Sequence, residues 1–273
     1  MVTFQEVPNI QIWGTITTTR KSSTNPKDTE TVTMEAPGYE ERVGLMLKNI
    51  RWSWTGWALL VAIFKLGSHK MIIRPWTNFP KIDPTKGVMP VAKNVNATAS
   101  PTDFKGATPK GQQALSCGVN PGTPVAGVVG TGSGSDTVVA FSPEMWTVDG
   151  SNPLGTGPGI SANEILVHEM THGFRQMSGK LICNATPDQA GYDTSEEFTA
   201  ILVSNMYRSE MKMAGLRQDH WGFQKLPVDQ EDPATFLKVG ANKARASQFY
   251  SEHREFGGNL KKVSAPFNPM KLL

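Results

Sequence analysis

One stretch of the chain constrains the fold more than any other, because it carries a helix start, a helix end and a regular apolar pattern. Residues 161–179 read SANEILVHEMTHGFRQMSG. Ser161 followed by Glu164 is typical of a capping box at a helix start, and Gly179 stands where a left-handed helix end is common. Large apolar side chains recur between these ends at helical spacing. The stretch therefore predicts one amphipathic helix of about five turns.

His168 and His172 lie four residues apart in this stretch, so a helix places both imidazoles on one face. Two neutral imidazoles in this arrangement can bind one zinc ion at about 2.0–2.1 Å. Glu169 lies between them but is offset from the pair, where it can take a proton from a water that the metal activates. The pattern therefore predicts one zinc ion per chain with Glu169 as a catalytic base. The alternative is a pair of ordinary histidines on a structural helix.

A catalytic zinc site needs a third protein ligand, and the next predicted helix supplies candidates. Residues 193–210 read DTSEEFTAILVSNMYRSE, with apolar side chains again at helical spacing. Glu196 and Glu197 lie in its first turn. Either carboxylate could instead stabilise the helix start, since Thr194 followed by Glu197 also fits a capping box. We expect one of them to bind the metal, because two buried imidazoles need an anionic partner on a rigid element.

A hydrolase of this kind also needs a donor for the negative charge that develops on the substrate carbonyl. We predict His220 for this catalytic role, because the neighbouring acid Asp219 can orient its ring or keep it charged. Tyr192 and Tyr207 are alternatives through their phenolic hydroxyl groups. Asn205, two turns along the ligand helix, is either a hydrogen-bond partner of a metal ligand or a packing residue.

These residues resemble the zincin metallopeptidases. HEMTH followed by a helix that begins EEFTA is similar to the branch of that family whose third zinc ligand is a glutamate on the helix after the motif helix. In that branch the ligand stands three residues before a small residue, a pattern matched by Glu197 and Ala200. The resemblance therefore favours Glu197 over Glu196 as the third ligand, beside His168 and His172.

The wider stretch, over about residues 137–225, resembles metallopeptidase effector or toxin domains that Gram-negative bacteria deliver through specialised secretion machines. The resemblance implies an α+β, zincin-like fold, with a small mixed or antiparallel sheet packed on the motif helix and the ligand helix. It implies a zinc-dependent peptidase with a protein or peptide substrate, and a delivery or immunity protein as a further partner. The alternatives are a non-catalytic, metal-stabilised binding module and a hydrolase of a non-peptide amide such as cell-wall material.

Charge and hydropathy argue against two other classes of protein. The net charge is only +3, and the basic residues are spread along the chain, so nothing indicates a nucleic-acid partner. The longest apolar run, residues 57–64, is far shorter than the roughly 20 residues of a membrane-spanning helix and predicts a core helix or buried strand. Around it, Trp52, Trp54 and Trp57 predict a packed aromatic cluster rather than a membrane-interface belt.

The first residues lack the basic region and the continuous apolar segment of a Sec-type signal peptide. We therefore expect secretion by a route that is independent of a signal peptide, with a cytoplasmic location as the alternative. Cys117 and Cys183 lack the spacing of a metal or redox motif, and the sequence fits either a disulfide or two free thiols. His69 and His253 are predicted to be ordinary surface residues.

The first third of the chain gives weaker patterns. Alternating apolar residues predict half-buried strands around residues 10–16 and 32–34, joined by a polar loop over 17–30, and a helix follows over 39–49. Residues 77–112 are rich in Pro, Lys, Asn and Gly, which favours an irregular surface connection.

Two β-branched runs precede the motif helix. Pro124–Val129 and residues 137–141 flank a glycine-rich turn, so we predict a hairpin, and the free edge of the second run is expected to form one wall of a cleft. The predicted organisation is an N-terminal region of unknown role over 1–112, possibly part of the same fold, a zincin-like domain over 113–255, and an irregular tail over 256–273.

Overall fold

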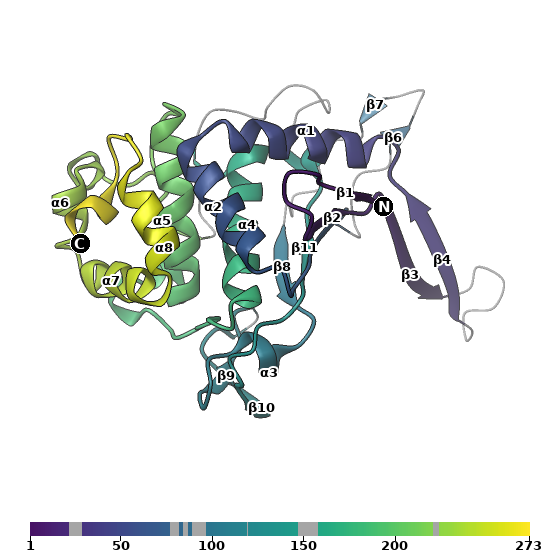
Figure 1. Cartoon of the computed structure of the whole chain (residues 1–273), viewed down its shortest axis with the longest axis horizontal. Coiled ribbons are helices and arrows are strands. Elements are labelled where there is room, and N and C mark those ends of the chain that lie inside the picture. The colour runs from purple at the N-terminus through teal and green to yellow at the C-terminus, as the bar shows by residue number, and fades with distance from the viewer. Residues whose placement is uncertain are drawn as a thin grey trace.

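The chain folds into an α+β structure in which a mixed sheet and a group of helices lie on opposite sides of α4 (Figure 1). The computed structural model describes residues 1–21, 29–76, 82–83, 87–88, 97–118, 120–146, 158–220 and 224–273. In chain order the elements are β1 (Val2–Thr3), β2 (Ile10–Ile12), β3 (Thr15–Lys21), β4 (Thr29–Glu35), α1 (Tyr39–Arg51), α2 (Trp54–Lys65), β5 (Met71–Arg74), β6 (Ile82–Asp83), β7 (Gly87–Val88), β8 (Thr98–Pro101), α3 (Phe104–Ala107), β9 (Gln113–Leu115), β10 (Pro124–Val129), β11 (Thr137–Ala140), α4 (Ala162–Met177), α5 (Ser195–Glu210), α6 (Pro233–Phe236), α7 (Asn242–Glu252) and α8 (Arg254–Lys261), with 3-10 segments at Pro143–Trp146, Pro187–Tyr192, Val228–Glu231 and Pro269–Leu272.

The main sheet has the strand order β1-β2-β5-β11-β8. β2 and β11 run parallel to β5, whereas β8 runs antiparallel to β11 and forms the outer edge. The register pairs Val139 with Ile73 on one side and with Ala99 on the other. Residues of β5 and β11 alternate between buried and half-buried, the period-two pattern of a sheet with one covered face. That face packs on α4.

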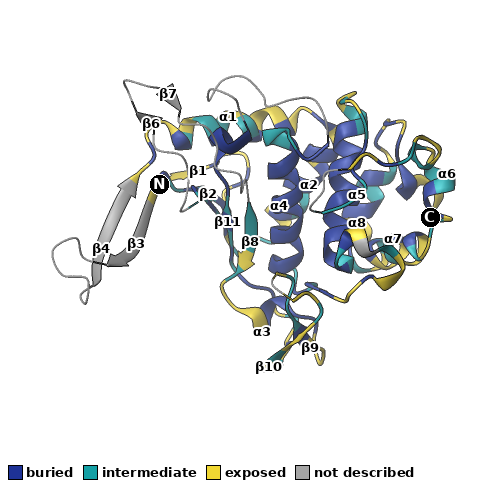
Figure 2. Cartoon of the chain, turned by 180° about the vertical axis from the view of Figure 1, so that it is seen from behind, coloured by how far each residue is buried: buried dark blue, intermediate teal, exposed yellow. Residues whose placement is uncertain are grey.

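One hydrophobic core joins the sheet to the helices. It includes Ile10 and Ile73 from the sheet, Leu166 from α4, Leu202 from α5 and Phe267 near the C-terminus. Figure 2 shows α4 and α5 buried along almost their whole length. Residues from all three parts of the predicted organisation therefore contribute to a single core.

The predicted loop over residues 17–30 is wrong for residues 17–21 and 29–30, half of its length. β3 continues to Lys21, and β4 begins at Thr29 and pairs with it in antiparallel register. These runs are rich in threonine, whose branched β-carbon favours extended backbone, so polarity alone was misleading. The side chains around Ile16 and Val32, whose half-burial the sequence predicts, lie outside the described residues, as does the backbone of 22–28. The helix predicted over 39–49 is confirmed as α1.

The predicted hairpin of the two β-branched runs is also wrong. Both runs are strands, but β10 pairs with β9, and β11 enters the main sheet between β5 and β8. The glycine-rich segment between the two strands does not form a tight hairpin turn but packs closely on other backbone. A β-carbon on Gly130 would lie 2.2 Å from the carbonyl oxygen of Pro109. β11 consequently has no free edge, and β8 supplies the edge instead.

β8 lies in the stretch 77–112 that the sequence predicts to be irregular, so that prediction is wrong for residues 98–101. β6, β7 and α3 also lie in that stretch. Residues 77–81, 84–86 and 89–96 lie outside the described residues. The edge strand was missed because four residues with no apolar alternation give almost no signal of their own.

The apolar run 57–64 forms part of helix α2, as predicted. The predicted packed cluster of tryptophans is wrong, because all three side chains are exposed, although the rings of Trp54 and Trp57 meet edge to face. Trp52, Trp54 and Trp57 are 85%, 64% and 37% exposed. Helical spacing turns them away from the face on which Leu60 and Ile63 enter the core. Among the described residues, no helix has the length and apolar character that a membrane span needs.

The C-terminal residues do not form the predicted irregular tail. α8 spans Arg254–Lys261, and Phe256, Phe267 and Met270 are buried. The glycines that favoured an irregular segment lie inside this helix, where a β-carbon on Gly257 would meet the Tyr250 ring at 2.5 Å. Glycine is present here because two helices approach closely, and not because the chain turns.

His253 is buried instead of lying on the surface as predicted. Its ring centroid is 4.6 Å from that of Phe174 and 5.5 Å from that of Phe249, and its Nε2 is 3.2 Å from Nη1 of Arg175. Burial, followed by the charge of Arg175, lowers the pKa of His253 from 6.5 to about 3. The folded protein therefore keeps this imidazole neutral.

This histidine should make the protein sensitive to acid. The unfolded chain binds a proton at His253 near pH 6.5, whereas the folded chain does so only near pH 3, so stability is lost as the pH falls between these values. In urea unfolding, we expect the variant His253→Phe to lose less stability than the wild type between about pH 6.5 and pH 4, by on the order of 3 kcal/mol. Parallel curves for the two proteins would contradict this account.

Candidate metal centre

The helix predicted over 161–179 is confirmed as α4, and Gly179 has the left-handed conformation expected at its end, with φ of 67°. The predicted capping box is wrong, because Ser161 makes no side-chain cap. Glu164 instead accepts hydrogen bonds from the amide of Gly159, at 2.9 and 3.0 Å, and forms an ion pair with Arg208 of α5 at 2.5 Å. The two sequence motifs are thus joined at the start of α4.

The structure brings the three predicted metal ligands together. The Nε2 atoms of His168 and His172 are 3.1 Å apart. Oε2 of Glu197, on the first turn of α5, is 3.2 Å from the first nitrogen and 3.3 Å from the second. Thr194 caps α5 as predicted, accepting a hydrogen bond from the amide of Glu197 at 3.2 Å. The cap uses only the backbone of Glu197 and leaves its carboxylate directed at the imidazoles.

These three atoms fit a zinc ion. Ligands about 2.0–2.1 Å from a tetrahedral zinc lie about 3.3–3.4 Å from one another. The three measured separations are close to that value, and two nitrogens with one carboxylate oxygen are a donor set that zinc accepts. Nε2 of His220 lies 3.5 Å from the same oxygen of Glu197. His168, Glu197 and His220 each offer one possible ligand atom, and these three atoms lie within 4.8 Å of one another.

The charges at the centre favour a cation beside Glu197. Burial opposes ionisation of its carboxyl group, yet His172 and the neighbouring imidazoles hold the pKa of Glu197 well below its ordinary value. Burial likewise opposes a charge on His172, but the carboxylates of Glu197 and Glu196 raise the pKa of this imidazole. Positive charge is therefore stabilised in the space that the donor atoms enclose.

Glu169 has a different environment from Glu197. Burial raises the pKa of its carboxyl group to about 7, and the backbone amide of Ala99 in β8 donates a hydrogen bond to it. The carbonyl oxygen of Ala99 accepts a hydrogen bond from Gln176, also on α4, at 2.9 Å. Glu169 is thus held at the edge strand, beside the donor atoms but not among them.

Glu196 faces away from the three donor atoms. One oxygen lies 3.5 Å from Nδ1 of His172, and the other lies 2.8 Å from Nε of Arg175. Nη1 of Arg175 forms an ion pair with Glu252 of α7 at 2.9 Å. Because Glu196 contacts the ring nitrogen opposite the donor atom, it is suited to orient His172 and not to share its metal.

His220 enters the centre on a segment that follows α5. Its Nδ1 lies 2.9 Å from the carboxylate of Asp193, which precedes it by 27 residues. The predicted orienting acid was Asp219, but that carboxylate accepts a hydrogen bond from the amide of Gln224. The prediction was wrong because the backbone turns between adjacent residues, so neighbouring side chains diverge. No local pattern around residue 193 could have identified this contact.

Asn205 and Arg217 fix this segment. The amide side chain of Asn205 accepts a hydrogen bond from the Arg217 amide at 2.7 Å and donates one to its carbonyl at 2.8 Å. The Arg217 guanidinium donates to the carbonyl oxygens of Asp219 and His220. Asn205 therefore holds the backbone that carries His220, a role that sequence reasoning missed.

The two tyrosines considered as alternatives to His220 are buried elsewhere. Tyr192 packs edge to face on Phe198, with ring centroids 5.3 Å apart. Burial, together with nearby carboxylates, raises the pKa of Tyr207 to about 12. Neither is among the described residues that line the cavity at the metal centre.

A cavity of about 520 Å³ opens beside the donor atoms. Residues 97–101 of the edge strand form one wall, and residues 116–118 next to β9 form another, while Glu169, His172, Glu197 and His220 lie on its inner surface. A disulfide between Cys117 and Cys183, with α-carbons 5.0 Å apart, ties the second wall to the segment before α5. The cysteines that the sequence left open are thus paired.

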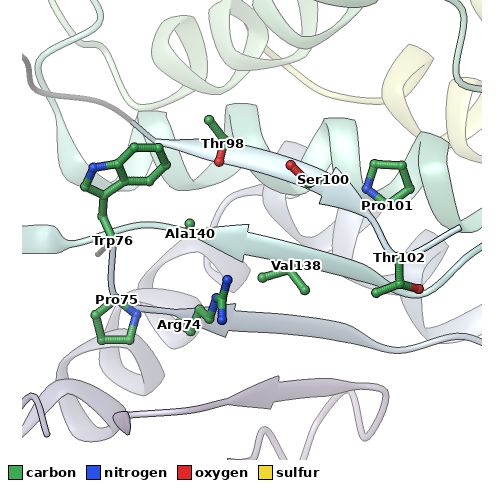
Figure 3. A pocket seen from close by; sticks show the side chains of 9 residues that line it. All are labelled: Arg74, Pro75, Trp76, Thr98, Ser100, Pro101, Thr102, Val138 and Ala140. Atoms are coloured by element: carbon green, nitrogen blue, oxygen red, sulfur yellow. The ribbon is translucent and has the colours of Figure 1, made fainter. Parts of the chain in front are cut away.

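A second cavity, of about 270 Å³, lies on the opposite face of the sheet (Figure 3). Its walls are Arg74 of β5, Val138 and Ala140 of β11, and Thr98 and Ser100 of β8. These are the alternate residues of strands whose other face covers α4. Figure 3 shows no histidine or carboxylate among the labelled residues, so the described residues of this cavity do not supply the groups that a catalytic metal requires.

Comparison with known proteins identifies the family. A family model described as an effector protein, Peptidase_M91, matches residues 26–252. No curated protein and no solved structure matches the chain. The matched range includes the edge strand, both ligand helices and the segment that carries His220. The chain therefore belongs to the Peptidase_M91 family and contains a bacterial effector domain of the metallopeptidase type.

Proposed function

We propose that this protein is a zinc-dependent peptidase that acts as a delivered effector. Family membership supports peptidase activity and delivery to another cell or compartment. The observation that carries the proposal is the near-equilateral set of donor atoms from His168, His172 and Glu197, at 3.1 to 3.3 Å, together with the cavity that His172 and Glu197 line. A structural metal would not need a cavity beside it.

These three side chains would hold the ion, and Glu196 would orient His172 through Nδ1. When bound, zinc would supply a Lewis acid that activates water and polarises the carbonyl of the scissile bond. The site is rigid because its ligands come from two packed helices, which the Glu164–Arg208 ion pair also joins.

Glu169 would be the general base. A base works best when its pKa is close to the working pH, and burial raises the pKa of Glu169 to about 7. Its carboxylate would take a proton from the attacking water and then pass it to the leaving amine. The hydrogen bond from the Ala99 amide fixes the carboxylate for both steps.

His220 would donate a hydrogen bond to the carbonyl oxygen as negative charge develops there. Its Nε2 faces the donor atoms, at 3.5 Å from Glu197, and Asp193 fixes the ring through Nδ1 at 2.9 Å. A carboxylate at Nδ1 favours the tautomer, or the charged form, in which Nε2 carries the proton. His220 would therefore stabilise the transition state more than the bound substrate.

The substrate would be an extended peptide that lies along β8. β8 is the outer strand of the sheet and lines the cavity, so a peptide can add to it as a further strand. The amide and carbonyl of Ala99 bond to Glu169 and Gln176. These two backbone groups are therefore already occupied, and the peptide would pair with other backbone groups of this edge.

Zinc content and affinity test the proposal. We expect about one zinc per purified chain and hydrolysis of casein that a chelator abolishes. The variant Glu197→Ala should lose the metal, whereas Glu196→Ala should keep one zinc per chain with affinity weakened by about 10–100-fold, the usual effect of removing a group that orients a ligand. Glu255→Ala, on the exposed surface, is the control and should match the wild type.

Four results would count against the proposal or a part of it. Equal zinc loss from Glu197→Ala and Glu196→Ala would mean that Glu197 is not distinguished from Glu196 as a metal ligand. A protein that holds no zinc after dialysis against zinc salts would have no zinc site at these residues. Peptidoglycan hydrolysis without casein hydrolysis would point to a non-peptide amide as substrate. Inactive protein with full zinc content on every substrate would support a structural metal.

A further inference from the structure

Helix α1 is followed directly by α2 (Figure 1). Three tryptophans at this junction are exposed. Trp52, Trp54 and Trp57 are 85%, 64% and 37% exposed, and the rings of Trp54 and Trp57 meet edge to face with centroids 5.7 Å apart. Single exposed apolar residues are common on soluble proteins, but adjoining aromatic rings form a patch of the kind that marks an interaction surface.

Neighbouring residues extend this patch. The carboxylate of Glu210 accepts hydrogen bonds from the amides of Trp54 and Thr55, at 2.5 and 2.9 Å, which brings the end of α5 against the start of α2. Met211, 44% exposed, follows directly. Phe64, 53% exposed, continues the same face along α2, since residues 54, 57, 61 and 64 recur at helical spacing. We name Trp52, Trp54, Trp57, Phe64 and Met211 the aromatic face.

The charges next to the aromatic face are mainly positive. Lys48, Arg51 and Lys212 are exposed, and no ion pair between described residues involves any of them. Lys48 stands one turn before Trp52 on α1, and Lys212 follows Met211. Glu210, an acid next to this face, already binds two backbone amides, and Glu255 pairs with Lys65. The surface around the tryptophans therefore attracts anions.

We propose that the aromatic face binds the surface of an anionic lipid bilayer. Tryptophan side chains favour the headgroup level of a membrane, because the indole ring is apolar and its N–H is polar. Exposed lysine and arginine next to them attract anionic headgroups. The rest of α2 stays packed on α4 and α5, so the protein would lie on the membrane and not cross it. This inference does not depend on the metal centre.

Vesicle binding by the chain of 273 residues tests the proposal. We expect co-sedimentation with phosphatidylcholine vesicles that contain about 30 mol% phosphatidylserine, weak binding to pure phosphatidylcholine, and weaker binding at high salt. Tryptophan emission should shift to shorter wavelength on binding. The double variant W54A/W57A should weaken binding by about tenfold or more and remove most of the spectral shift, and K48E/R51E should weaken binding mainly at low salt.

The variant Val228→Ala is the matched control, because it shortens a lone apolar side chain that is 86% exposed outside the aromatic face. It should bind vesicles like the wild type. Circular dichroism and thermal unfolding of every variant establish that the fold is retained. The proposal fails if anionic vesicles do not bind, or if W54A/W57A binds them unchanged. It also fails if the wild type forms a dimer without vesicles that W54A/W57A abolishes, because the face would then bind a second copy.

Discussion

The variant Glu169→Gln should lose about 10³-fold in kcat for peptide hydrolysis while it keeps its zinc and its fold, because proton transfer by a positioned base contributes about 10²–10⁴-fold. Glutamine has almost the same shape and can still accept the hydrogen bond from Ala99, but it cannot take a proton from water. Steady-state kinetics on a peptide cleaved by the wild type, together with zinc analysis of the same sample, measures the effect.

The contrast with Glu255→Gln makes this test specific, since Glu255 is 62% exposed and pairs with Lys65 at the surface. That variant should keep wild-type kinetics. If Glu169→Gln retained full activity, Glu169 would not be the base, even if the metal were catalytic. A simultaneous loss of zinc and of thermal stability would instead mean that the carboxylate has a structural role.

The variant Glu164→Ala should destabilise the protein by about 3–5 kcal/mol, the usual result of leaving one member of a buried ion pair without its partner. Glu164 and Arg208 are both fully buried and join the start of α4 to α5. The variant also loses the acceptor for the Gly159 amide. Urea unfolding gives the free energy of unfolding, and zinc affinity should fall with it because the two ligand helices would lose their link.

The exposed pair Lys65–Glu255 provides the comparison for this prediction. Glu255→Ala should change the free energy of unfolding by less than about 1 kcal/mol, because surface ion pairs are hydrated and contribute little. Similarly small changes in the free energy of unfolding for Glu164→Ala and Glu255→Ala would show that other hydrogen bonds stabilise the charge of Arg208. Its guanidinium donates such bonds to the carbonyl oxygens of Gly215 and Ala214.

Local patterns in the sequence were sufficient to predict the two ligand helices. Each has helical apolar spacing, and each begins and ends close to the residue that the pattern indicates. His168 and His172 share a face because they are one turn apart. Glu197 faces them in the structure, a position that the sequence indicated only through resemblance to a family. The roles of these residues in catalysis stay predictions.

The parts of the site that were missed depend on contacts between distant residues. Asp193 reaches His220 across 27 residues, and the edge strand acquires its place only by pairing with β11. Ser161 fits a capping motif, yet Glu164 binds Gly159 and Arg208 because a buried guanidinium stabilises its carboxylate more than a helix end does. These contacts depend on the environment in the folded protein, and the periodicity of the sequence gives no information about that environment.

The disulfide between Cys117 and Cys183 has a consequence for the unfolded chain as well as for the cavity. The cysteines are 66 residues apart, and α4 lies wholly within the loop that they close. Closing a loop of this length removes about 4 kcal/mol of chain entropy from the denatured state in a simple polymer model. An oxidised chain that has lost all other structure therefore still keeps its histidine pair inside a covalent ring, and folding of the region around α4 starts from a restricted set of conformations.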